Sequence, residues 1–159
     1  MKMMIIGESP SHTRPDGMKN IPFSGKTSYH LWDELKKYNI TRKDCIITNV
    51  VEKLLLKGNK PTNNMIKENL PRLYSIIKKH KIKLIMTMGK IPTEAILEQQ
   101  IKMREVAGNI FYTKNEDAIV IPCIHPAAVG RSLVNKILFE KSIKNAMIIL
   151  EDIKKLYVT

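Results

Sequence analysis

Short apolar runs recur along the chain, separated by segments whose apolar residues have helical spacing. A buried strand is typically an apolar run of about four to eight residues that ends at glycine or a polar residue. The runs of this kind predict strands at residues 2–6, 45–51, 82–89, 108–113 and 118–126.

The segments between and after these runs carry apolar residues on one side of a helix. Leu31 and Leu35, four positions apart, are an example. Pro71 lies inside the second such segment and predicts either a kink or a later helix start, because proline donates no backbone hydrogen bond. The pattern predicts helices at residues 27–40, 64–81, 91–100 and 132–157.

The alternation of strand and helix predicts an α/β fold, a three-layer α/β/α sandwich. Its central sheet should be mostly parallel, and we expect four strands in it. A length of 159 residues and a hydrophobic content of 43% suit one domain over residues 1–159. Ligands of such sheets bind beyond the carboxyl ends of the strands. The strand ends at Glu8, Asn49 and His125 should therefore meet at one edge.

These three residue types suit chemistry at that edge, although each also has a structural explanation. Glu8 can activate water as a base or can be a solvated loop acid. The Asn49 amide can contact a base edge through a donor and an acceptor, or can cap a turn. His125 can donate to a developing anion, or can stabilise the turn that begins at Pro126.

The polar loop over residues 8–26 is unusually long for a compact domain, and loops of this length are usually functional or disordered. Phe23 in this loop can stack on a nucleobase or cover the edge of the core. The stretch from Gly25 to Ser28 is similar to the end of a phosphate-binding loop. Asn20 stands where that motif needs glycine, so we discount it.

The charge balance favours a polyanionic partner. There are 27 Lys and Arg residues against 15 Asp and Glu residues, a formal net charge of +12, which suits nucleic acid or an anionic membrane. A generally lysine-rich composition is the alternative explanation. The only two cysteines, Cys45 and Cys123, form no metal-ligand or disulfide pattern, so we expect a reduced protein of the cytoplasm. The apolar start is too short for a signal peptide.

Four blocks in this order resemble the uracil-DNA glycosylase superfamily, nearest to the iron–sulfur, thermostable, family 4-like branch. The blocks are "IIGESP", "DGMKNIPFSGKTSYHLWDEL", "IITNVVEK" with "GNKPTNNMIKENLPRL", and "IHPAAVGR". The stretch "LIMTMGKIPTEAIL" also resembles the segment between the last two blocks, and the similarity covers roughly residues 4–131.

The departures from that branch concern its cofactor and its first motif. Lys53 and Asn69 stand where the branch has cluster cysteines, and its N-terminal cysteine pair is absent. We therefore expect no iron–sulfur cluster and no other cofactor or metal. Ser11 replaces a glycine of the first motif, and Ser9 stands where the cluster-free main branch has its water-activating aspartate. The resemblance therefore leaves Glu8 as the first choice for the catalytic acid and Asp16 as the second.

The resemblance implies a mechanism in which a nucleotide is flipped out of the duplex into a pocket. Phe23 stacks on the base, Asn49 hydrogen-bonds its edge, and Glu8 or Asp16 positions a water. His125 donates to the departing base, and the loop after His125 wedges into the minor groove. The residues assigned to DNA contact are Ser11, Lys26, Ala128, Val129, Arg131 and Ser132.

The leading hypothesis is a monomeric, monofunctional DNA glycosylase that excises uracil or a related base and leaves an abasic site. One alternative is excision of a hydroxymethylated or glucosylated cytosine from phage DNA, as a defence. A second is a non-catalytic DNA-binding module on the same fold. A third alternative is an α/β enzyme that binds nucleotides or sugar phosphates. The sequence lacks the glycine-rich motifs that such enzymes usually carry.

Overall fold

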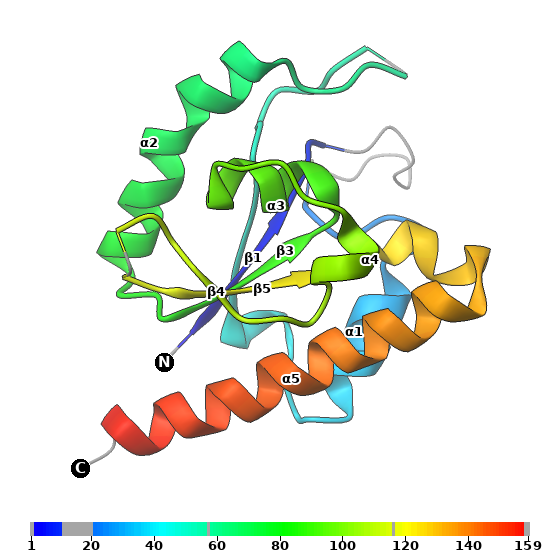
Figure 1. The fold of residues 1–159 in the computed structure, drawn as a ribbon, viewed down its shortest axis with the longest axis vertical. Coiled ribbons are helices and arrows are strands. Elements are labelled where there is room, and N and C mark those ends of the chain that lie inside the picture. The colour runs from blue at the N-terminus through cyan, green and yellow to red at the C-terminus, as the bar shows by residue number, and fades with distance from the viewer. Residues whose placement is uncertain (1, 11–20, 57, 116, 158–159) are drawn as a thin grey trace.

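The computed structural model describes residues 2–10, 21–56, 58–115 and 117–157. Its centre is a five-stranded sheet in the order β2-β1-β3-β5-β4 (Figure 1). The strands are β1 (Met3–Gly7), β2 (Cys45–Asn49), β3 (Leu84–Met88), β4 (Phe111–Tyr112) and β5 (Ile119–Cys123). Strands β2, β1, β3 and β5 are parallel, and β4 pairs antiparallel with β5. The mostly parallel α/β fold is confirmed, but the expected number of four strands is wrong.

Strand β4 is short because the residues just before it leave the extended conformation. The sequence predicted a strand over 108–113, whereas β4 contains two residues. Gly108 has a φ of +82°, outside the extended region. The Asn109 N–H bonds back to the carbonyl of Val106, which forms a turn. β4 is therefore an edge addition to the four parallel strands.

The helices cover both faces of the sheet (Figure 1). They are α1 (Tyr29–Lys36), α2 (Asn63–Lys79), α3 (Lys90–Leu97), α4 (Met103–Val106) and α5 (Leu133–Tyr157). Two short 3₁₀ segments are also present: η1 (Arg42–Asp44) leads into β2, and η2 (Pro126–Arg131) lies between β5 and α5. The sequence did not predict α4. Pro71 lies inside α2, so the alternative of a later start is wrong; Thr62 caps that helix by accepting from the Met65 N–H at 3.2 Å.

Each parallel strand contributes to two cores, one on each face. Along β1, Met3 and Ile5 join the core under α1 and α5, and Met4 and Ile6 join the core under α2. All residues of β1 and β3 are buried. This explains their continuous apolar runs, since side chains alternate between two covered faces.

The stability of this arrangement is testable within α5. Ile143 is fully buried (0% exposed), whereas Ile137 of the same helix is 54% exposed. Ile143→Ala should lower the free energy of unfolding by about 2–5 kcal/mol, because it leaves a cavity in the core. The control Ile137→Ala should change it by about 0.5 kcal/mol or less. Equal losses in urea denaturation would contradict the packing described for α5.

Candidate active site

A pocket of about 90 Å³ opens at the carboxyl edge of the sheet. The predicted strand ends meet there, since Glu8, Asn49 and His125 all line it. The strand register explains this meeting, because Gly7 at the end of β1 pairs with Asn49 at the end of β2. The loop residue Phe23 also lines the pocket.

Gly7 makes this convergence possible because it has no side chain. A Cβ atom at this position would lie 2.5 Å from Asn49 Oδ1 and 2.8 Å from Phe23 Cζ. Both distances are shorter than van der Waals contact allows. The amide and the aromatic ring therefore reach the same volume only over a glycine.

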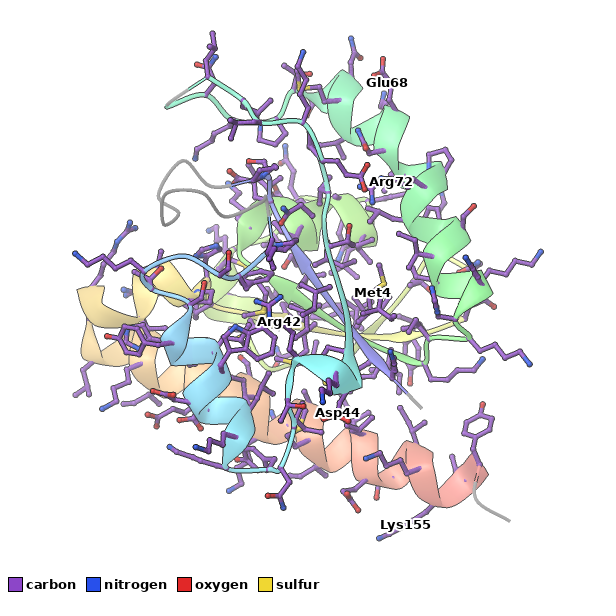
Figure 2. All side chains as sticks on the ribbon, turned by 180° about the vertical axis from the view of Figure 1, so that it is seen from behind. Met4, Arg42, Asp44, Glu68, Arg72 and Lys155 are labelled. Atoms are coloured by element: carbon purple, nitrogen blue, oxygen red, sulfur yellow. The ribbon has the colours of Figure 1, made fainter. Side chains whose placement is uncertain are left out.

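Arg72 fixes the backbone that carries Asn49. Figure 2 shows Arg72 extending from α2 toward the segment that follows β2. Its Nη2 donates to the carbonyls of Asn49 at 2.7 Å and Val50 at 2.9 Å, and its Nη1 donates to Thr48 Oγ1 at 3.0 Å. Asn49 is only 8% exposed and still lines the pocket. Its amide thus offers a donor and an acceptor to a pocket ligand from a fixed main chain.

The sequence analysis missed Arg72, although a signal was available. Arg72 lies four residues before Ile76 and between Leu70 and Leu73, on a helix with an apolar face. The guanidinium of an arginine so close to an apolar face either reaches solvent beyond that face or donates hydrogen bonds to oxygen atoms of the protein. The structure shows the second case, with three oxygen atoms of residues 48–50 as acceptors.

His125 is held in one tautomer. Its Nδ1 accepts a hydrogen bond from the Ala127 N–H at 3.0 Å, so the proton of the neutral ring is on Nε2. Burial lowers the pKa of His125, and the nearby Arg131 lowers it further. The neutral form is therefore favoured at pH 7, with Nε2–H as the donor left for a ligand.

Phe23 and His125 form two neighbouring walls of the pocket. Their ring centroids are 6.2 Å apart, and their planes are inclined by 38°. His125 also lies beside the residue that follows β3, because a Cβ added at Gly89 would lie 3.4 Å from His125 Cβ. A flat ligand would meet an aromatic face on one side and a hydrogen-bond donor at its edge.

Glu8 supplies the carboxylate of the pocket. Burial raises the pKa of Glu8, and the positive charge of Lys60 opposes that shift. A raised pKa makes a carboxylate a better proton acceptor, which suits the activation of water. The alternative acid, Asp16, lies outside the described residues, and so does Ser11.

The residues assigned to DNA contact have different surroundings. Lys26 and Arg131 are exposed, and Ala128 and Ser132 are half-buried. Val129 is 6% exposed and packs in the core under α1 and α5, so this position does not suit a wedge between bases. Its neighbours Ala127 and Gly130 are exposed.

The cysteines do not fit the iron–sulfur cluster that the family 4-like resemblance implies. Such a cluster is held by four thiolates, whereas the chain has two cysteines. Cys45 on β2 and Cys123 on β5 are separated by strands β1 and β3. Both are buried, and burial raises the pKa of the Cys45 thiol to about 12, which disfavours the thiolate that a metal needs. No step of the mechanism is assigned to a cluster.

Within residues 2–10, 21–56, 58–115 and 117–157, no group of three or more His, Cys, Asp or Glu side chains is arranged to hold a metal ion. No helix in this part of the chain is both long and apolar enough to cross a membrane.

Comparison with known proteins agrees with the resemblance seen in the motifs. Over 147 residues the chain is 29% identical to the type-4 uracil-DNA glycosylase of Pyrobaculum aerophilum, which covers 89% of this chain and 74% of that protein. Over 134 residues it is 28% identical to the type-4 uracil-DNA glycosylase of Saccharolobus solfataricus, covering 80% of this chain and 61% of that protein. The family model of the uracil DNA glycosylase superfamily matches residues 1–147. Because that match spans most of the chain, this protein belongs to the uracil-DNA glycosylase superfamily.

Proposed function

We propose that this protein is a DNA glycosylase that hydrolyses the bond between deoxyribose and uracil, or a related base, in DNA. The observation that carries the proposal is one pocket lined by an aromatic ring, an amide, a neutral imidazole and a carboxylate, from Phe23, Asn49, His125 and Glu8. The names of the similar proteins and the net charge of +12 support DNA as the substrate.

The target nucleotide leaves the base stack and enters the pocket, since a pocket at the sheet edge cannot reach a base inside a duplex. Phe23 stacks on the base and Asn49 bonds its polar edge. An amide can satisfy a neighbouring carbonyl and N–H of a pyrimidine at the same time. These two residues would select the base.

The bond between C1′ and the base nitrogen breaks with both electrons remaining on the base. The base becomes an anion, and the sugar becomes an oxocarbenium ion. The Nε2–H of His125 donates a hydrogen bond to the anion, and the Glu8 carboxylate stabilises the cation. Water then adds to C1′ and gives a proton to Glu8. That proton passes through solvent to the base anion, so the base is released neutral and Glu8 returns to its carboxylate form.

The proposed reaction is monofunctional, so it ends at an abasic site without cutting the strand. Enzymes that also cut the strand use an amine nucleophile that forms a Schiff base. No lysine is found among the described residues that line the pocket. Hydrolysis by water is therefore the chemistry that these side chains support.

Excision from labelled oligonucleotides tests the proposal, with strand breaks read after hot alkali. Suitable substrates are uracil opposite guanine or adenine, uracil in single strands, hypoxanthine, hydroxymethylcytosine and glucosylated hydroxymethylcytosine. We expect excision of uracil, and no strand breaks before the alkali treatment. Excision of only the modified cytosines would keep the chemistry and change the substrate. Binding without any excision would reject the proposal in favour of a binding module.

Asn49→Ala should lower kcat/KM for the excised base by about tenfold to hundredfold, because a bidentate contact to a base edge contributes about 1–3 kcal/mol. The control Asn64→Ala changes an exposed amide on α2 and should leave the rate unchanged. If Asn49→Ala keeps the wild-type rate, its amide does not contact the base.

The pH dependence of kcat/KM should show loss of activity toward acid. Both proposed groups work deprotonated: neutral His125 keeps Nδ1 as an acceptor, and Glu8 must accept a proton. Burial raises the pKa of Glu8 and lowers the pKa of His125. Activity should therefore be lost in a pH range that lies above the ordinary pKa of a carboxylate and below the ordinary pKa of an imidazole. Glu8→Gln should lower kcat/KM and remove the contribution of Glu8 to the acid side of the pH profile, so that only the titration of His125 shapes it. A pH profile identical to that of the wild type would show that Glu8 takes no part in the reaction.

A further inference from the structure

Phe23 has a backbone conformation that its residue type disfavours. Its φ is +55°, in the left-handed region, where a Cβ atom crowds the following carbonyl. Such a conformation persists only when surrounding contacts hold it. In an exposed loop without such contacts, Phe23 would relax and its ring would leave the pocket.

Two side chains from other elements hold this loop by its carbonyl groups. The indole Nε1–H of Trp32, on α1, donates to the Phe23 carbonyl at 2.9 Å. The Nη2 of Arg42, on η1, donates to the same carbonyl at 2.7 Å and to the Pro22 carbonyl at 2.8 Å. The guanidinium also stacks on the Trp32 ring, with 4.6 Å between its Cζ and the ring centroid. Arg42 is labelled in Figure 2.

The contacts of Arg42 are unusual for a partly buried cation. Arg42 is half-buried, and this burial lowers the pKa of its guanidinium. Among the described residues, no carboxylate lies within 4.0 Å of it to form a salt bridge. Its contacts are loop carbonyls and an indole face, so the charge stabilises the conformation at Phe23.

The same segment connects both proposed base contacts. Arg42 opens η1, which leads directly into β2, and β2 ends at Asn49. The Asp44 carboxylate fixes this turn by accepting from the Thr41 N–H at 2.8 Å and from Thr41 Oγ1 at 3.2 Å. One continuous segment therefore holds the Phe23 backbone at its start and presents the Asn49 amide at its end.

We propose that Trp32 and Arg42 are positioning residues that hold Phe23 in its left-handed conformation, so that its ring is ready to stack on the extruded base. They do not touch the base themselves. This role rests on the proposed glycosylase function.

The first test is a double-mutant cycle on kcat/KM for base excision. Trp32→Phe removes the N–H but keeps an aromatic ring, and Arg42→Lys keeps the charge but loses the planar fork. Each should lower kcat/KM about tenfold, as expected when a buried hydrogen bond is lost. In a Phe23→Ala background, the same substitutions should have no further effect. Equal losses in both backgrounds would overturn the proposal. The control Lys43→Ala, an exposed residue of the same turn, should leave the rate unchanged.

The second test does not depend on catalysis. Backbone amide hydrogen exchange over residues 21–28 should be about tenfold faster in Arg42→Lys than in wild type or Lys43→Ala. Trp32 is the only tryptophan in the sequence, so its fluorescence should also change in Arg42→Lys. Unchanged exchange and fluorescence would overturn the positioning role of Trp32 and Arg42 even if the protein excises uracil. If exchange is faster but the protein excises no base, Trp32 and Arg42 do hold the backbone at Phe23, and the proposed function is rejected.

Discussion

The site depends on the absence of a side chain at Gly7. The parallel register places Gly7 beside Asn49, and Phe23 lies over the same point from the loop before α1. A single methyl group there would overlap both the amide and the ring. The sheet thus provides the position, and the glycine provides the space in which an aromatic face and a hydrogen-bonding edge can meet one flat ligand.

Two arginines stabilise the two sides of this pocket in the same manner. Arg72 binds the main chain behind Asn49, and Arg42 binds the main chain behind Phe23. Arg72 donates from Nη1 and Nη2 to a hydroxyl and two carbonyl oxygens, whereas Arg42 donates twice from Nη2 to carbonyl oxygens. A planar guanidinium orients these donors, which the flexible ammonium of lysine does not. These contacts are to the main-chain carbonyls of Asn49 and Phe23, which leaves the side chains of both residues to the pocket. His125 is fixed by a local bond instead, from the Ala127 N–H. Preorganisation of this kind lowers the cost of orienting groups during a reaction.

Much of the fold and the pocket could be predicted from the sequence. Strands that are buried on both faces read as continuous apolar runs, and the carboxyl ends of parallel strands share one edge. The meeting of Glu8, Asn49 and His125 therefore follows from the alternation of elements. The family followed from motifs in order. A strand containing β4 was predicted over residues 108–113, but its bounds were wrong, because two residues on an edge carry little pattern. The burial of Val129 and the roles of Arg42 and Arg72 depend on contacts between distant segments. Local sequence does not encode such contacts.

The most direct test of the account is the single-turnover excision rate of Gly7→Ala on a uracil-containing oligonucleotide, with circular dichroism to confirm that the variant is folded. The added methyl should displace Asn49 or Phe23, and the account predicts a rate at least about a hundredfold below wild type, comparable to losing more than one well-placed contact. A folded variant that excises uracil at the wild-type rate would contradict the claim that base recognition occurs over Gly7.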